Sequence, residues 1–311
     1  MKTRLKMVVP APLDIESADK QYLESSGFIL YDDLPTDNQD LLHRIVDAEL
    51  LVAAKINVDQ ALIDSLPKLQ YIIVPSVGFE WVDTAYARSK NILVMNCPTH
   101  NSIAVAEHAV MLALATKRKL LAVNQGMKSG VWYSEDYAGN EIYSKQIAII
   151  GNGRTGKHIG RIIEGFGAEI SYITSNSNPE DLKRAANTSD IIFICVASND
   201  STKEMISRSF FQQMKKDTVL VNTSRGTVID QAALIETLGQ GMISAGLDVF
   251  QGEPDHHETI PLEIMDIANL HNVTATPHVA YKTRESGERL VTEVVDVVNS
   301  CLEGTPINVV N

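Results

Sequence analysis

The feature that most constrains this chain is a glycine loop between an apolar run and a helical pattern, in the stretch Gln146–Ile163 (QIAIIGNGRTGKHIGRII). Its glycines, Gly151, Gly153 and Gly156, have the spacing G-x-G-x-x-G. In such a loop the first two glycines permit a tight turn and close approach to a pyrophosphate, and the third lets the helix pack on the strand. The N–H groups and dipole of that helix then hold the negative charge. Because strand and helix flank the loop in the required order, we predict a dinucleotide-binding unit rather than an ordinary turn.

Length and composition allow two soluble domains and disfavour a polyanionic partner. A chain of 311 residues has room for two domains, and 44% hydrophobic with 21% charged residues is typical of globular proteins. The formal net charge of -12 disfavours nucleic acid and anionic membrane surfaces, since both need a basic face. The most apolar long stretch, 102–116, is interrupted by Glu107 and His108, so we expect no membrane span.

The three cysteines, Cys97, Cys195 and Cys301, are scattered and show no metal-binding or redox spacing. Cys195 lies in an apolar run, so we expect it to pack in a core. The apolar run near the N-terminus is too short for a signal peptide. We therefore expect a cytoplasmic protein without a metal site.

Short apolar runs alternate with amphipathic stretches in two series, separated by a break at Pro98. Alternation of this kind predicts βαβ units on parallel sheets, and hence an α/β fold of two doubly wound domains. The predicted strands cover 5–9, 28–31, 50–54, 69–74 and 92–95 in the first series, and 147–150, 169–173, 191–195, 219–221, 243–247 and 273–275 in the second. The predicted helices include 17–25, 39–47, a long helix from Ser102 to about Leu121, and a last helix, 283–302, which we expect to return to the first domain.

Charged side chains follow three predicted strands of the second series. Arg225 follows the fourth, Asp248 and Glu253 follow the fifth, and His278 follows the sixth. Ligands of open α/β sheets bind beyond the carboxyl ends of the strands, and parallel strands bring those ends to one edge. Each residue alone would more often belong to a turn or to the structural framework. Their convergence at the edge that carries the glycine loop favours a site.

An arginine, a carboxylate and a histidine beside a dinucleotide suggest reduction of a carbonyl group. Hydride moves from a nicotinamide to the carbonyl carbon, and a histidine can supply the proton that the oxygen needs. A carboxylate such as Glu253 would stabilise the imidazolium, and Arg225 could hold a substrate carboxylate and polarise the carbonyl. The implied substrate is a 2-oxo acid or, in reverse, a 2-hydroxy acid. His256 and His257, beside Glu258, lack metal-ligand spacing and are expected to be solvated.

Several further motifs stand in order along the chain. They are Ser76-Val77-Gly78, Asn101 with Val105-Ala106-Glu107-His108, the glycine loop, Asn222-Thr223-Ser224-Arg225-Gly226, Leu247-Asp248-Val249-Phe250 with Glu253-Pro254, Thr276-Pro277-His278, and the tail Pro306-Ile307-Asn308-Val309-Val310-Asn311. With these motifs the chain resembles the D-isomer-specific 2-hydroxyacid dehydrogenases over almost its whole length.

The resemblance implies a role for each matching residue. Arg225 would bind and polarise the substrate, His278 would be the acid/base, and Glu253 its partner. Substrate contacts would also come from the Val77–Gly78 backbone and from Asn101. The expected cofactor residues are Val105, Gly151, Gly153, Arg154, Thr155, Gly156, Thr174, Ser175, Asn176, Val196, Ala197, Thr202, Thr223, Asp248 at the nicotinamide, and Ala280.

The resemblance also implies the organisation of the molecule. We expect a discontinuous, flavodoxin-like substrate domain formed by residues 1–98 and 283–311. Residues 99–282 would form a Rossmann nucleotide-binding domain. The family usually dimerises through that domain, so a homodimer is expected.

The chain departs from the family pattern at the cofactor's ribose. NAD users usually carry an acid after the second strand of the nucleotide domain, and here the matching residue is Thr174. Loss of that acid removes repulsion of a 2′-phosphate, which hydroxyls and an amide could bind. No arginine or lysine adjoins it. We expect use of NADP or of both cofactors, and the alternative is NAD with weaker ribose binding.

Three other positions are unusual. Ala197 stands where relatives often have proline. Phe79 and Trp81 add bulk near the carboxylate loop, where they could line a pocket but are expected to pack below the loop. Lys55 follows a predicted strand at the matching edge and could contact an anionic substrate, although an exposed lysine is the alternative.

The sequence therefore predicts a cytoplasmic NAD(P)-dependent reductase that converts a 2-oxo acid to the D-2-hydroxy acid, with domains closing around the cofactor. One alternative is a nucleotide-sensing, corepressor-like binding protein on the same fold. Another is 3-phosphoglycerate dehydrogenase, which the lack of a regulatory domain after Asn311 makes less favoured. The sequence does not choose among 2-oxo acids.

Overall fold

The computed structural model describes residues 5–254 and 259–311, so His256, His257 and Glu258 lie outside the described residues. The chain divides into two compact units. Unit 1 comprises Met1–Asn101 with Lys282–Asn311, and unit 2 comprises Ser102–Tyr281. The chain leaves unit 1 three residues later, and returns to it one residue earlier, than the sequence indicated.

Unit 1 is built on a five-stranded parallel sheet in the order β2-β1-β3-β4-β5. This is the flavodoxin-like order, with its switch point between β1 and β3, and it confirms the predicted fold class. The strands are β1 (Met7–Val9), β2 (Phe28–Leu30), β3 (Leu50–Val52), β4 (Tyr71–Val74) and β5 (Leu93–Asn96).

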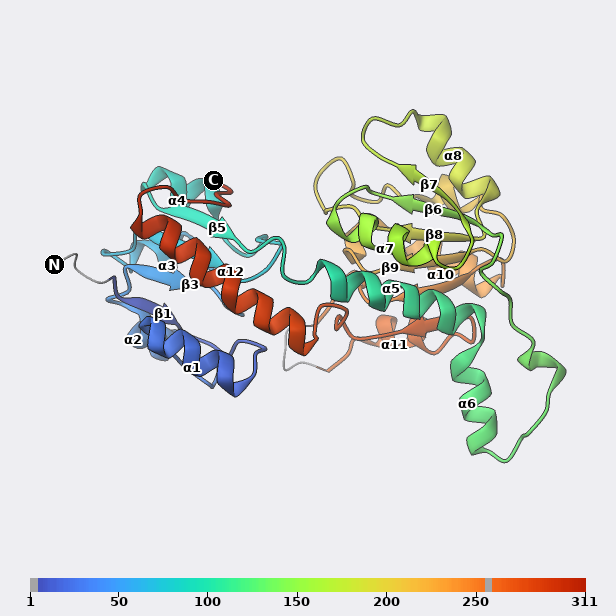
Figure 1. The fold of residues 1–311 in the computed structure, drawn as a ribbon, viewed down its shortest axis with the longest axis horizontal. Coiled ribbons are helices and arrows are strands. Elements are labelled where there is room, and N and C mark those ends of the chain that lie inside the picture. Colours follow the sequence, from blue (N-terminus) through green and yellow to red (C-terminus); the bar gives the residue numbers. More distant parts are fainter. Residues whose placement is uncertain (1–4, 255–258) are drawn as a thin grey trace. The chain divides into compact units, whose positions relative to one another are not determined.

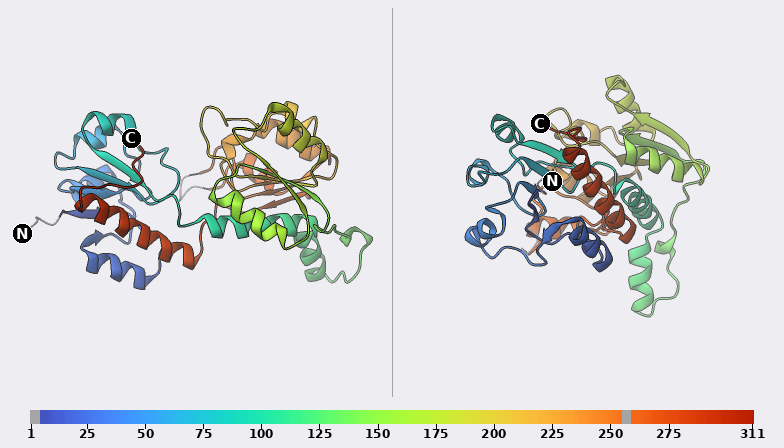
Figure 2. Two further views of the ribbon diagram at one scale, coloured as in Figure 1. Left: turned by 45° about the horizontal axis from the view of Figure 1, so that its top comes forward. Right: turned by 60° about the vertical axis from the view of Figure 1, so that its left-hand side comes forward.

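Alternate side chains of these strands point to opposite faces, and different helices cover the two faces. Leu51 and Ile72 pack toward α2, α3 and α4, whereas Leu50 and Ile73 pack toward α1 and α12. Figures 1 and 2 show α12 beside α1, so the last helix does return to the first unit. The helices are α1 (Ser17–Ser26), α2 (Asn38–Ile45), α3 (Gln60–Asp64), α4 (Thr84–Ser89) and α12 (Arg284–Leu302).

Unit 2 contains a six-stranded parallel sheet in the order β11-β10-β9-β8-β6-β7. Read from β7 to β11, the strand order is the same as in unit 1, with one more strand at the end. Its switch point lies between β6 and β8, where ligands of open α/β sheets bind. The strands are β6 (Gln146–Ile150), β7 (Glu169–Ile173), β8 (Ile191–Ile194), β9 (Val219–Asn222), β10 (Ser244–Leu247) and β11 (Val273–Ala275), and their ends lie within two residues of the predicted ones.

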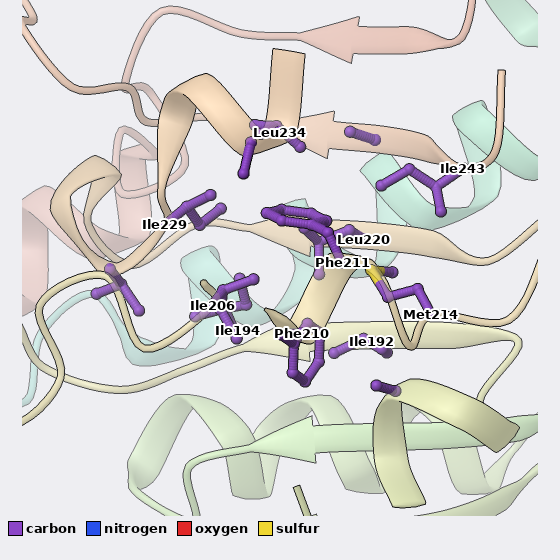
Figure 3. Packing of buried hydrophobic residues seen from close by; sticks show 14 of the residues in the cluster. Ile192, Ile194, Ile206, Phe210, Phe211, Met214, Leu220, Ile229, Leu234 and Ile243 are labelled. Carbon is purple, nitrogen blue, oxygen red and sulfur yellow. The ribbon is translucent and has the colours of Figure 1, made fainter. Parts of the chain in front are cut away.

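Helices cover both faces of this sheet. On one face Phe193 and Val221 pack toward α5 and α7. On the other, Ile192 and Leu220 pack toward α8 to α11; Figure 3 shows Phe210 and Phe211 of α9 within this cluster. The elements are α5 (Ser102–Lys117), α6 (Leu120–Lys128), η1 (Glu135–Tyr137), α7 (Arg154–Glu164), α8 (Pro179–Thr188), α9 (Arg208–Phe211), η2 (Gly226–Val228), α10 (Gln231–Gly239) and α11 (Leu262–Ala268).

The long helix expected to run to Leu121 ends at Lys117, so that prediction was wrong. Lys119 takes a left-handed conformation (φ 51°), and α6 begins after it. The buried Lys117 ammonium donates to the Asp217 carbonyl (3.1 Å), which fixes the end of α5 to the body of unit 2. α6 buries none of its residues and stands away from the sheet of unit 2 (Figure 1).

Two further findings concern the part of the chain that the structure describes. Every helix there is too short or too polar to span a lipid bilayer. No three histidine, cysteine or carboxylate side chains gather there as metal ligands could.

Candidate active site

The glycine loop after β6 fits a bound pyrophosphate. Gly151 has φ 108°, and a Cβ there would overlap the carbonyl that follows β8. A Cβ on Gly156 would overlap the Gly151 carbonyl. Gly153, the N-cap of α7, has nothing within 4 Å of where a Cβ would lie. The first and third glycines are thus needed for the turn and for helix packing, while the second leaves room for a ligand at the helix N-terminus, where Arg154 and Thr155 lie.

The loop after β7 is a turn closed by its own hydroxyl groups. Thr174 N–H donates to the Ser177 hydroxyl (3.0 Å), and Asn176 N–H donates to the Thr174 hydroxyl (3.2 Å). Ser175 and Asn176 are exposed. At the expected ribose position the loop therefore presents hydroxyl and amide groups in place of a carboxylate.

The loop after β8 is held by Thr202, whose hydroxyl donates to the Ala197 carbonyl (2.6 Å). Burial raises the pKa of the neighbouring Cys195 thiol to about 12, as expected for a packing residue. The remaining expected cofactor residues are Val196, which precedes Ala197, Thr223 after β9, Ala280 after β11, and Val105 in α5.

Glu253 and His278 form a direct pair. Loops after neighbouring strands, β10 and β11, place the His278 Nδ1 atom 2.6 Å from Glu253 Oε2. Burial raises the pKa of Glu253, but the His278 hydrogen bond, the Phe250 N–H (2.8 Å) and the Arg225 charge outweigh burial and lower that pKa. The carboxylate thus stays ionised, and with Nδ1 engaged, Nε2 is the nitrogen left for a reactant. The His278 ring also meets Tyr281 edge-on, at 6.1 Å between centroids.

Arg225 lies after β9, beside the loop of Glu253. Its Nη1 donates to the Ser224 carbonyl (2.8 Å), and the Asn222 side chain donates to the Arg225 carbonyl (2.9 Å). The next residue, Gly226, lies so close to Phe250 that a Cβ would overlap the Phe250 carbonyl. The backbones of the loops after β9 and β10 therefore lie in close contact at Gly226, and Arg225 is close enough to lower the pKa of Glu253.

Asp248 was expected as a nicotinamide contact. Its carboxylate accepts hydrogen bonds from the loop that carries His278. The residue is 1% exposed. Its Oδ1 accepts from the Thr276 hydroxyl (2.6 Å) and Val279 N–H (2.9 Å), and Oδ2 accepts from Ala280 N–H (2.9 Å). His278 N–H donates to the Asp248 carbonyl (2.8 Å). These bonds could not be predicted from the sequence, because they join loops of two different strands.

The loop after β4 in unit 1 carries two adjacent amides without a hydrogen-bond acceptor among the described residues, on the exposed Val77 and the buried Gly78. The loop is braced from both sides: the Ser76 hydroxyl donates to the Gly78 carbonyl (2.6 Å), and the Asn96 side chain donates to the Val77 carbonyl (2.8 Å). Two such amides can bind a carboxylate. Phe79 and Trp81 pack against the core of unit 1, which confirms that they support the loop from below.

Lys55 lies after β3 at the same edge of the unit 1 sheet, in a left-handed conformation (φ 52°). Its side chain is 21% exposed, and its Nζ lies 3.3 Å from Asp14 Oδ1. Lys282 Nζ approaches the same oxygen (3.4 Å). Lys55 is therefore a partly buried ion-pair member rather than a freely exposed lysine. Asn101 is half-buried where the chain leaves unit 1.

Comparison with known proteins identifies the family of the chain. Residues 110–280 match the NAD-binding domain model of the D-isomer specific 2-hydroxyacid dehydrogenases. Glyoxylate/hydroxypyruvate reductase B of Serratia proteamaculans (strain 568) is 33% identical over 98% of this chain and 96% of its own length.

Two solved structures show the same fold over nearly the whole chain. An acyclic imino acid reductase (Bsp5) in complex with NADPH and D-Arg has a TM-score of 0.87 with 26% identity, and covers 99% of this chain and 100% of its own. D-Lactate dehydrogenase from Aquifex aeolicus, complexed with NAD and lactic acid, has a TM-score of 0.82 with 25% identity over 96% of both chains. This chain belongs to the D-isomer specific 2-hydroxyacid dehydrogenase family.

Proposed function

We propose that the protein is an NAD(P)H-dependent reductase that converts a small 2-oxo acid to the D-2-hydroxy acid. The observation that carries this proposal is the Glu253–His278 pair, formed beside Arg225 at the edge of the sheet that also presents the glycine loop. An arginine for a carboxylate and a carboxylate-bound histidine for a proton are the groups that this reduction needs.

The glycine loop would hold the nicotinamide cofactor, which would supply a hydride to the carbonyl carbon. Arg225 binds the substrate and polarises its carbonyl for this transfer. His278 gives a proton from Nε2 to the carbonyl oxygen, while Nδ1 stays on Glu253. Glu253, ionised because its pKa is lowered, orients the ring and stabilises its protonated form. The Val77 and Gly78 amides receive the substrate carboxylate, and Lys55 and Asn101 complete the set of substrate residues.

Turnover should depend on His278 far more than cofactor binding does. The test follows nicotinamide absorbance at about 340 nm across a panel of 2-oxo acids. His278→Ala should reduce kcat by about 100-fold or more and leave the cofactor Kd unchanged, because it removes a proton donor. Arg225→Ala should mainly weaken substrate use. A His278→Ala enzyme that kept most of its kcat would disprove the proton-transfer role.

The same panel separates the two alternatives. A corepressor-like protein would bind the cofactor and reduce none of the acids. A 3-phosphoglycerate dehydrogenase would reduce only a phosphorylated 2-oxo acid in the panel.

For the cofactor we propose NADP or both NADP and NAD. The loop of Thr174 presents hydroxyl and amide groups, which can bind a 2′-phosphate and do not repel it. Comparison of kcat/KM with NADPH and NADH tests this, and a large preference for NADH would contradict it.

We further propose a homodimer in a reducing cytoplasm. Residues 120–137 of unit 2, which run from α6 to η1 and are called the α6 segment below, expose large apolar side chains, with Trp132 87% and Met127 65% exposed. It borders a hollow of about 870 Å³ between α5, α6 and α7, lined in part by Met111, Leu120 and Phe166. Exposed apolar surface of this kind favours burial against a second copy. The three cysteines are free, as expected in a reducing compartment.

A further inference from the structure

One titratable side chain near the proposed site has no part in the chemistry above. His108 lies in α5, and its side chain is 17% exposed. Its Nε2 atom lies 2.9 Å from the Thr276 hydroxyl, and that hydroxyl donates to Asp248 Oδ1 (2.6 Å). A chain of hydrogen bonds therefore leads from α5 to the carboxylate after β10.

The directions of these bonds follow from counting protons. A hydroxyl group has one proton, and Thr276 gives it to Asp248. Thr276 can therefore only accept from His108, which must carry a proton on Nε2. Burial lowers the pKa of His108, although the Asp248 charge opposes this. The ring is thus the neutral tautomer with its proton on Nε2, donating toward the buried carboxylate.

The far end of the chain is the loop of His278. Asp248 fixes that loop by accepting from Val279 N–H and Ala280 N–H, both at 2.9 Å, while its carbonyl accepts from His278 N–H. His278 is held with φ 52°, a left-handed conformation that residues other than glycine rarely adopt. Such a conformation persists only where the surroundings over-determine it. The carboxylate and its donors provide that constraint.

We propose that His108 and Thr276 are positioning residues for His278, acting through Asp248. His108 orients the Thr276 hydroxyl, and Thr276 joins two backbone amides in fixing the Asp248 carboxylate. The carboxylate in turn holds His278 where its ring meets Glu253 and the substrate. The expected effect on kcat rests on the proposed function, whereas the expected effect on the loop of His278 does not.

The kinetic test removes one bond at a time with little change of volume. Thr276→Val keeps the shape of the side chain and loses the hydroxyl, and His108→Leu loses the donor. Each should lower kcat by about 10- to 100-fold with KM and cofactor Kd little changed, because small displacements of a catalytic group carry penalties of that size. Thr276→Ser and His108→Gln restore a hydroxyl and an N–H donor and should recover most of kcat. His158→Leu, in α7 and outside this chain of bonds, is the control.

A second readout does not depend on activity. Amide hydrogen exchange at residues 278–280 should accelerate in Thr276→Val and His108→Leu but not in the two restoring variants or the control. If the wild type reduces no 2-oxo acid, the proposed function fails and exchange still decides the positioning role. Unchanged exchange, or a kcat within about twofold of wild type in both removing variants, would overturn the inference. So would failure of both restoring variants to recover what was lost.

Discussion

At the scale of single residues, Gly226 decides where Arg225 can lie. A Cβ at this position would overlap the backbone carbonyl of Phe250, which cannot rotate away as a side chain could. The loops after β9 and β10 can approach only because the side chain is absent. Glu253, three residues beyond Phe250, is thereby kept near enough to Arg225 for the guanidinium to lower its pKa.

Gly226→Ala should therefore damage both the fold and the site. Forcing the two backbones apart should cost about 1–3 kcal/mol of unfolding free energy, as overpacking does. Because the shift separates Arg225 from Glu253, kcat/KM should fall as well. Thermal unfolding and 2-oxo acid reduction measure the two effects. Gly239→Ala is the matched control, since its Cβ would meet nothing within 4 Å and should leave both properties unchanged or slightly improve stability. Equal behaviour of the two variants would refute the argument.

The sequence could predict the main residues of the site but not the bonds that position them. Arg225, Glu253 and His278 could be predicted because each follows a strand, and parallel strands bring their carboxyl ends to one edge. The hydrogen bonds of Thr276 and His108 could not be predicted in this way. They join a loop and a helix distant in sequence, and no spacing rule reports which donor meets which acceptor.

At the scale of elements, α12 holds the segment through which the chain leaves unit 1. Glu293 of α12 accepts from Thr99 N–H (3.1 Å) and His100 N–H (3.1 Å), and Arg289 donates to the His100 carbonyl (2.7 Å). Burial raises the pKa of Glu293, but hydrogen bonds from His100 and Thr99 outweigh burial and lower it. The ionised carboxylate is therefore the form that the folded state favours.

This geometry predicts a pH-dependent effect of Glu293→Gln. A carboxyl group whose folded pKa is lowered stabilises the protein above its unfolded value of 4.5, and that stability is lost as pH falls through the folded pKa. The variant should thus unfold at a lower temperature than wild type near pH 7, and the gap should close below pH 4.5. Asp296→Asn, an exposed change on the same helix, should show no such gap. A difference independent of pH would mean that charge at Glu293 plays no part.

Strands were predicted within two residues, whereas the end of α5 was missed. Strands are marked by apolar runs bounded by polar residues, which is a local signal. Nothing local stops α5 at Lys117, because residues 118–121 include neither glycine nor proline. The helix stops where the buried Lys117 ammonium reaches the Asp217 carbonyl, 100 residues away in the chain. Such a tertiary contact overrides helix propensity and cannot be read from sequence.

At the scale of the whole molecule, two sheets of the same strand order carry different parts of the proposed chemistry. Unit 1 offers two amides without an acceptor among the described residues, and unit 2 offers the glycine loop, Arg225 and His278. Both sets lie beyond the carboxyl ends of parallel strands. The α6 segment belongs to neither set. It buries none of its helical residues and exposes Trp132 and Tyr133, although large aromatic side chains are costly to leave in water.

The α6 segment should therefore be covered in solution by a second copy of the chain. Light scattering of wild type should give twice 34.1 kDa, and Trp132→Ser or Leu120→Ser should shift the protein toward 34.1 kDa, because each removes apolar area from the proposed interface. Leu262→Ser, in α11 and 76% exposed, is the matched control and should remain dimeric. A monomeric wild type would contradict the prediction, and so would dissociation of the Leu262→Ser control alone. Retention of the dimer by both interface variants would show that the α6 segment is not the contact between copies.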